Sequence, residues 1–190
     1  MAEDIGGIKD AGPWIEKANP TYTVLVDQQH LIASLYGMVN VPTAVWINEK
    51  GRIVRPNETA FIDNRYKSMH GIDAKPYLDG LRDWLANGDK SAYAMSPEQL
   101  RQRLAPPEPA AIQADAYFRL AQFMVASGLN REAIPYFKEA QRLRPDDWNY
   151  KRQAWLLTDA EKDYGTSFNK EVQKLNGKPY YPPLDLPKAK

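Results

Sequence analysis

The stretch NVPTAVWINEKGRIV, residues 40–54, decides the fold of the first part of the chain. Its apolar run at residues 43–48 is followed by the turn residues Glu49-Lys50-Gly51 and then by a second short run at residues 52–54. Two such runs joined by a glycine-containing turn are typical of a β-hairpin. This stretch therefore predicts two antiparallel strands.

The residues before this hairpin predict a helix, a strand and a second helix. Residues 8–18 place apolar side chains on one helical stripe, and residues 21–26 (TYTVLV) are apolar and β-branched, as in a buried strand. Asp27 then suits the N-cap of a helix over residues 28–36, and Gly37 suits its left-handed stop.

The residues after the hairpin predict a loop and then an amphipathic helix. Residues 56–72 show no sustained period, whereas apolar side chains recur at helical spacing from Tyr77 to Leu85, before Asn87-Gly88. Ser96-Pro97 is typical of the start of a short helix, and the prolines of residues 106–109 are typical of a stiff break. The boundary between two subdomains is expected between residues 88 and 110.

Three helices are expected after this boundary, over residues 111–127, 131–143 and 147–163. Set against the 34-residue tetratricopeptide (TPR) pattern, residues 114–147 match at Leu120, Ala121, Gly128, Ala133, Phe137, Ala140 and Pro145. This segment resembles one TPR repeat, and the resemblance implies a partner-binding inner face formed by Asp115, Phe118 and Gln122. The alternative is a helical pair that packs on a neighbouring element and binds no ligand.

Residues 1–88 resemble the thioredoxin superfamily, and within it the TlpA and ResA group of thiol-disulfide oxidoreductases. The resemblance is carried by Asp27 after a predicted strand, by Tyr36-Gly37 at a helix end, and by Asn40-Val41-Pro42-Thr43 before the next strand. It implies a cis Val41–Pro42 bond and a substrate-binding role for Val41, Pro42 and Thr43. The alternative is an ordinary turn in which proline opens a strand.

The family places a strand, a helix with a Cys-x-x-Cys motif and a second strand before this region. Residues 1–4 look like the end of that second strand, and the sequence contains no cysteine. The strand at residues 43–48 would then lack its central neighbour, and an uncovered apolar edge invites pairing. We expect an upstream part of a longer polypeptide, a strand from a partner or second copy, or the carboxy-terminal helices to cover it.

Composition excludes several other classes of function. Basic and acidic residues number 25 and 24, so no net field favours nucleic acid. No apolar stretch is long enough for a membrane span, and the N-terminus lacks the pattern of a signal peptide, which indicates a cytoplasmic chain as written, or an extracytoplasmic one if the true start lies upstream. His30 and His70 show no ligand spacing, so neither a metal nor a cofactor is expected. We expect His30 to be solvated at the start of a helix and His70 to lie in a loop.

The expected fold class is thus α/β, a partial thioredoxin-like fold over residues 1–88, followed by an all-α TPR-like segment. Residues 89–109 form a linker with a short helix, residues 110–163 the helical pair with a capping helix, and residues 164–190 a proline-rich tail. The predicted function is the downstream portion of a thiol-disulfide or peroxide-handling oxidoreductase, inactive as written because thiol chemistry needs a thiolate. The alternative is a non-enzymatic adaptor or accessory subunit of a larger assembly.

Overall fold

The computed structural model describes residues 1–187, and the chain divides into two compact units that are each built from two stretches. Unit 1 consists of Met1–Val39 and Pro107–Lys170, and unit 2 consists of Asn40–Pro106 and the described part of Glu171–Lys190. The described residues contain helices and one two-stranded antiparallel sheet, so the mixed α/β character that we predicted is confirmed. Among these residues, no helix has the length and apolar character that crossing a membrane requires.

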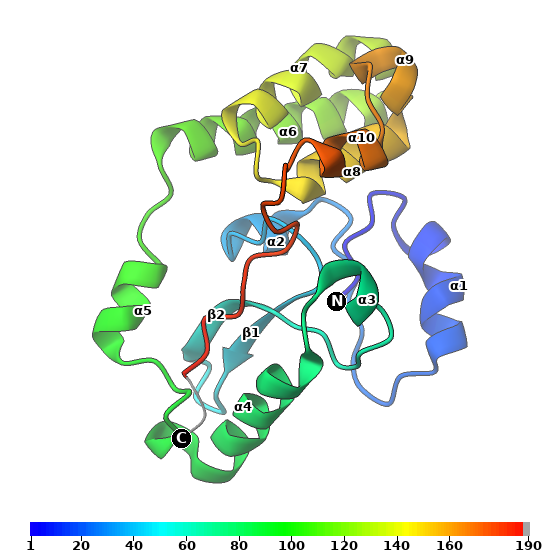
Figure 1. The fold of residues 1–190 in the computed structure, drawn as a ribbon. Coiled ribbons are helices and arrows are strands. Elements are labelled where there is room, and N and C mark those ends of the chain that lie inside the picture. The colour runs from blue at the N-terminus through cyan, green and yellow to red at the C-terminus, as the bar shows by residue number, and fades with distance from the viewer. Residues whose placement is uncertain (188–190) are drawn as a thin grey trace. The chain divides into compact units, whose positions relative to one another are not determined.

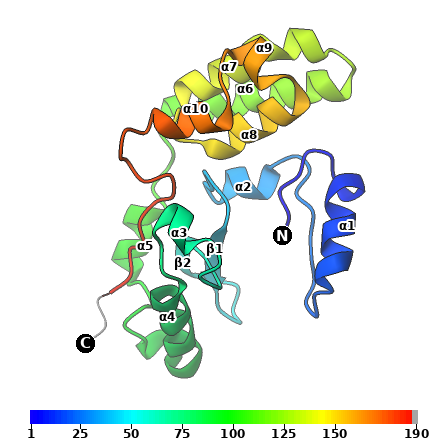
Figure 2. The same ribbon diagram turned by 45° about the vertical axis from the view of Figure 1, so that its right-hand side comes forward.

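Unit 1 is helical (Figures 1 and 2). The predicted helical pair is present as two antiparallel neighbours, and the predicted helix over residues 147–163 is two helices that break at Thr158 and Asp159. Asp159 accepts hydrogen bonds from the backbone N–H groups of Glu161 and Lys162, which starts a new helix after the break. The helices are α1 (Ile8–Ala18), α2 (Leu31–Leu35), α6 (Pro109–Ala126), α7 (Asn130–Leu143), α8 (Trp148–Leu157), α9 (Ala160–Tyr164) and α10 (Phe168–Gln173), the last of which ends in unit 2.

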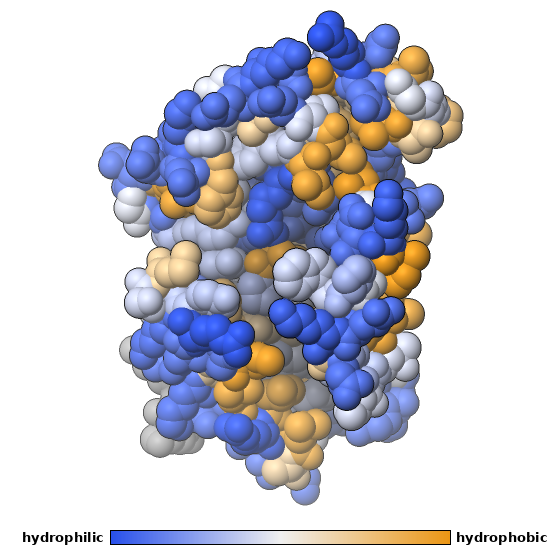
Figure 3. Space-filling model, turned by 90° about the vertical axis from the view of Figure 1, so that its right-hand side faces the viewer, coloured by the Kyte–Doolittle hydropathy of each residue, from blue (hydrophilic) through white to orange (hydrophobic). Residues whose placement is uncertain are grey.

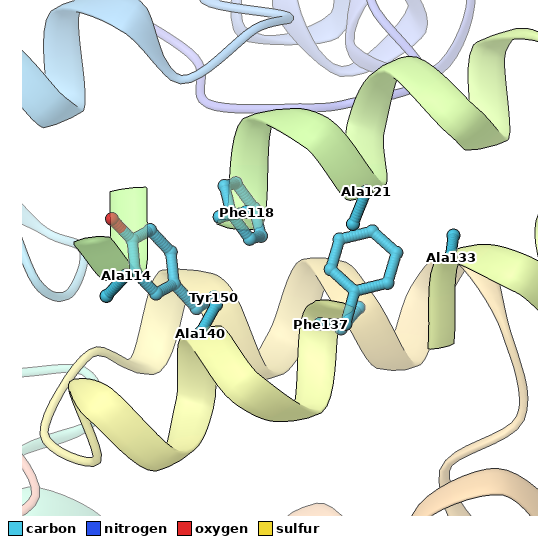
Figure 4. Close-up of a cluster of buried hydrophobic side chains, with 8 residues drawn as sticks. Ala114, Phe118, Ala121, Ala133, Phe137, Ala140 and Tyr150 are labelled. Atoms are coloured by element: carbon cyan, nitrogen blue, oxygen red, sulfur yellow. The ribbon is translucent and has the colours of Figure 1, made fainter. Parts of the chain in front are cut away.

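Small alanines and two phenylalanines form the core between α6, α7 and α8 (Figure 4). Phe118 of α6 lies edge-on to Phe137 of α7, with ring centroids 5.6 Å apart, and stacks on Tyr150 of α8 at 4.3 Å. The alanines leave room for this close approach. They are Ala114, Ala121, Ala133, Ala140 and Ala154, all fully buried.

The prediction of a buried strand at residues 21–26 is wrong. Only Val26 pairs, through one parallel bridge to Ala2, and Tyr22 and Leu25 are exposed. Residues 21–26 have the composition of a strand, but a strand also needs a continuous partner, and the residues that the structure describes supply only this single bridge. Tyr22 and Leu25 are not the only exposed hydrophobic residues, and Figure 3 draws those on one face of the molecule in orange.

The helix predicted over residues 28–36 is present as the shorter α2. Asp27 accepts hydrogen bonds from the N–H groups of Leu31 at 2.9 Å and Ala33 at 3.0 Å, so it caps this helix as predicted. His30 adopts a left-handed conformation at φ 54°, which delays the start of the helix. Gly37 is left-handed at φ 64° after the helix ends.

Unit 2 is built on the predicted hairpin, in which β1 (Thr43–Ile47) pairs antiparallel with β2 (Ile53–Thr59). Strand β2 continues through Pro56 to Thr59, into residues that we expected to form a loop. The remaining elements are α3 (Lys67–His70), α4 (Ala74–Asn87), η1 (Gly88–Lys90) and α5 (Pro97–Arg103). The predicted start of α5 is confirmed, because Ser96 and Gln99 form a reciprocal capping box there.

The core of unit 2 lies between the hairpin and α4. Trp46 of β1 is 3% exposed, stacks on Trp84 with ring centroids 5.3 Å apart, and donates from Nε1 to the Tyr77 hydroxyl at 3.3 Å. The ring of Tyr93 packs against Gly80 of α4. A Cβ added at this position would lie 2.7 Å from that ring, so glycine is needed for the close approach. We expected residues 164–190 to form a proline-rich tail, but α10 (Phe168–Gln173) lies within that range. Further along, Leu184 and Leu186 pack against this same core.

Candidate functional site

The predicted substrate-binding turn, Val41-Pro42-Thr43, lies at the start of β1 in unit 2. The Val41–Pro42 peptide bond is cis, as predicted. Asn40 organises the turn, because its Oδ1 accepts from the Val41 N–H at 2.9 Å and its carbonyl accepts from the Thr43 hydroxyl at 2.6 Å. The Val41 N–H is therefore already engaged within the turn, and of its backbone polar groups the carbonyl is the one left to meet a ligand.

The edge of β1 that faces away from β2 adjoins this turn. The Pro42 carbonyl accepts from the Ala60 N–H at 3.2 Å, so Pro42 and, two residues on, Ala44 direct their backbone groups toward β2. The alternation then directs the backbone groups of Thr43 and Val45 to the other edge. No residue among 1–187 forms a strand on that edge.

The predicted partner-binding residues of α6 lie in unit 1, and two of them, Phe118 and Gln122, contact His30 of the same chain. Phe118 is 1% exposed and edge-on to His30, with ring centroids 5.7 Å apart, so it belongs to the core and presents no surface to a partner. Gln122 Nε2 lies 3.4 Å from His30 Nδ1, and Asp115 pairs with Arg119 at 2.8 Å.

The stretch after His30 is joined to the start of α8 by backbone hydrogen bonds. The Val39 carbonyl accepts from Trp148 N at 2.7 Å and from Asn149 N at 3.3 Å, and the Asn149 amide donates to the Met38 carbonyl at 3.0 Å. Residues 30–39 therefore contact α6 through His30 and the start of α8 through Met38 and Val39.

A cavity of about 500 Å³ opens beside Gln122 in unit 1. Polar side chains from α6 and from the residues before α2 line one part, and Arg119 contributes its guanidinium. No nucleophile or acid–base pair is among the lining residues, so the cavity suits binding more than catalysis. The lining residues are Ile5, Gln28, Gln29, Leu31, Arg119, Gln122, Phe123, Val125, Ala126 and Leu157.

Unit 1 also contains buried ionisable side chains, which no pattern in the sequence had indicated. Burial raises the pKa of Asp147 to about 7 in spite of Arg144 nearby, and burial with the charges of Asp27 and Asp147 raises the pKa of Glu3 to about 7. Burial also lowers the pKa of His30, which is 3% exposed, so the prediction that His30 is solvated is wrong. These groups make unit 1 sensitive to protons.

His70 lies in unit 2, where it ends the short helix α3 instead of lying in a loop as we expected. It is half-buried, because its ring stacks on Phe61 with centroids 3.9 Å apart. Within residues 1–187, no three His, Asp or Glu side chains come together as a metal site would require.

Comparisons with models of known protein families, with curated proteins and with solved structures find no match to this chain. The thioredoxin-like and TPR-like assignments therefore stay predictions.

Proposed function

We propose that this chain is a strand-accepting module, in which the free edge of β1 binds an extended segment and the turn at Val41-Pro42-Thr43 lies beside it. In the thioredoxin-like interpretation, the accepted segment carries the redox motif and this chain is the downstream portion of the oxidoreductase. The observation that carries the proposal is the one-sided pairing of β1, which bonds to β2 but to no other strand among the described residues.

The chemistry of this edge favours strand addition. It presents backbone donors and acceptors, and beside them the core side chain Trp46 is already buried within unit 2. An added strand gains main-chain hydrogen bonds, and no further apolar core has to form. β-Augmentation achieves its affinity in this way. By contrast, Lys and Pro residues, which protect natural edges, are absent from the β1 residues themselves.

Thiol chemistry would have to come from the accepted segment. The 190 residues contain no cysteine, and disulfide exchange proceeds through a thiolate. The purified chain is therefore expected to show no thiol-dependent disulfide reductase or peroxidase activity. Turnover that persists after contaminating thiols are removed would contradict this expectation.

The adaptor alternative uses the same edge without any redox step. In that case the accepted segment belongs to a partner or to a second copy of the chain, and a self-associated dimer is the simplest form. The α6 face gives this alternative less support, because His30 already contacts Phe118 and Gln122.

The test combines sedimentation across a dilution series with hydrogen exchange of the amides at residues 43–47. Association should slow exchange of the Thr43 and Val45 amides, which face the free edge. Val45→Pro should abolish association and leave the fold intact, because it removes an outward N–H and adds steric bulk at that edge.

Ala44→Pro is the matched control, since it removes an N–H that is directed toward β2 and should destabilise the hairpin itself. A monomer at every concentration, with rapid exchange at Thr43 and Val45 and no change on Val45→Pro, would refute self-association through this edge. Association that is lost only with Ala44→Pro would also place the contact elsewhere.

A further inference from the structure

Residues 180–187 (YYPPLDLP) run extended beside β2 in unit 2, where Figure 1 draws them in red. Leu184 and Leu186 are half-buried against the core cluster of Trp46, Val54 and Tyr77. Asp185, between them, has 71% of its side chain exposed and forms an ion pair with Arg103. This alternation is that of a peptide bound in an extended conformation, with alternate side chains held by the surface beneath.

Side chains of unit 2 bind the backbone of this segment. The receptor side chains are buried, with Glu58 1%, Asn40 2%, Arg55 3% and Thr59 4% exposed. The hydrogen bonds are Asn40 Nδ2 to the Tyr180 carbonyl at 3.1 Å, Thr59 Oγ1 to the Pro182 carbonyl at 2.9 Å, Arg55 Nη1 to the Asp185 carbonyl at 2.8 Å, and Asp185 N to Glu58 Oε2 at 3.4 Å.

Contacts outside the segment hold the charged receptor groups in place. Arg55 Nη1 donates to Glu58 Oε1 at 2.7 Å, and Arg55 Nε donates to the Tyr93 carbonyl at 2.8 Å. Arg103 also reaches Glu58 Oε1, at 3.4 Å. These contacts hold Arg55 and Glu58 in place independently of residues 180–187. Buried Asn40 and Thr59, by contrast, direct donors toward the segment and would lose hydrogen bonds without it.

The bound segment is also suited to the role of a ligand. Pro182 and Pro183 have no N–H that needs a partner, and they restrict the free peptide to extended conformations, which lowers the entropy lost on binding. The segment joins α10 through Asn176 and Gly177, both with positive φ at 48° and 85°. No ladder of backbone hydrogen bonds ties it to β2 among the described residues.

We propose that the surface formed by Asn40, Arg55, Glu58, Thr59 and Arg103, here called the tail site, binds extended peptides of the type Pro-Pro-Leu-Asp-Leu. Residues 180–187 are its resident ligand. The occupant in trans is a partner segment of the same chemistry, with two prolines followed by an acidic residue between two leucines. Arg103 selects the acidic residue, and the unit 2 core selects the leucines.

Competition with the resident segment decides how the test is built. A tethered ligand has an effective concentration in the millimolar range for a short flexible linker, so a free peptide competes poorly with the intact chain. A specific protease site inserted after Gly177 lets the tail be cut after the full chain has folded. A fluorescent peptide of residues 179–187 is then added, and its anisotropy is measured.

The cut chain should take up the peptide saturably, and the uncut chain should bind it at least about tenfold more weakly. Replacing Leu186 by Ser in the peptide should weaken binding by about tenfold or more, because that leucine loses its burial. Arg103→Gln in the chain should weaken it by about fivefold, and by no further factor when the peptide carries Asp185→Asn.

A peptide with the same residues in scrambled order is the control and should not bind. Three outcomes would overturn the proposal. In the first, the cut tail stays attached and never exchanges. In the second, the cut chain precipitates when the tail leaves and takes up no peptide. In the third, the scrambled peptide binds equally well. The first two would make residues 180–187 a permanent part of the core, and the third would make the contact nonspecific.

Discussion

The two units each bury a carboxylate, and they stabilise it in opposite ways. In unit 2, Glu58 is 1% exposed, 2.7 Å from Arg55 and 3.4 Å from Arg103. In unit 1, Asp147 is equally buried, but Arg144 lies farther away, at 3.5 Å, and the pKa of Asp147 is raised to about 7. The buried carboxylate of unit 2 is therefore stabilised in its charged form by arginines. The raised pKa of Asp147 in unit 1 instead favours the protonated form.

The largest expected effect comes from removing Arg55. Arg55→Met should lower the free energy of unfolding of unit 2 by about 3–5 kcal/mol, because Glu58 is left buried with only the partly exposed Arg103. Denaturant unfolding, with hydrogen exchange at β2 to identify unit 2, measures the loss.

The double variant Arg55→Met with Glu58→Met sharpens this result. It removes both charges and keeps apolar bulk, so it should recover much of the loss. If the double variant were less stable than Arg55→Met alone, the cost would lie in packing or in the tail contacts and not in an unpaired carboxylate.

The next effect is the pH dependence of unit 1. Folding raises the pKa of Asp147 and of Glu3 from about 4 to about 7, so the folded state binds more protons between these values. The stabilisation from these groups is complete below pH 4 and is lost as pH rises through 7. Thermal unfolding at pH 5 and pH 8 should therefore show unit 1 more stable at pH 5.

Asp147→Asn isolates one of the two carboxyls. Asparagine can still accept the hydrogen bond that Asp147 Oδ1 receives from Tyr150 N at 3.1 Å, so the cap of α8 is retained. The variant should gain stability at pH 8 and reduce the difference between pH 5 and pH 8. An unchanged pH dependence would show that Asp147 does not bind the proton.

His30 provides a smaller effect of the opposite sign. Burial lowers its pKa, so the folded state binds fewer protons than the unfolded state below pH 6.5, and stability falls as pH decreases through that range. His30→Gln should remove this opposing contribution and make the gain between pH 8 and pH 5 larger. A smaller gain in the variant would contradict the assignment.

The smallest effect is expected at an exposed carboxylate. Asp73 caps α4, and its hydrogen bonds, first with Lys67 and then with the Lys75 N–H, lower its pKa to about 2. Any stabilisation from its charge is present above pH 4 and is lost only as pH falls toward 2. Asp73→Asn keeps the cap but removes the charge, so it should lower the unfolding midpoint at pH 7 only slightly, which a thermal scan would verify.

Local patterns predicted the elements that need only neighbouring residues. The hairpin of residues 43–54 and the pair α6 and α7 follow from alternation, turn residues and helical spacing. Ser96 marks the predicted start of α5, and Gly37 follows α2. Residues 21–26 were mispredicted because a strand also requires a partner, which is a long-range property.

The candidate site divides in the same way. The position of the Val41-Pro42-Thr43 turn was predictable from the residues around it, but the burial of Phe118 was not, because Phe118 packs against His30, which lies far away in the sequence. The raised pKa of Asp147 likewise depends on burial that no local pattern encodes. The contacts of residues 180–187 were missed because prolines there looked like those of a surface tail.

The interleaving of the two units has a consequence for how the chain is made. Residues 40–106 leave the ribosome before the second half of unit 1, but their hydrogen bonds from Asn40, Arg55 and Thr59 are completed only by residues 180–187. Both stretches of unit 1 have been synthesised by Lys170, so unit 1 can close first. During translation, the surface of unit 2 that contacts Leu184 and Leu186 therefore stays exposed until residues 180–187 are made. A chaperone would bind it during that interval.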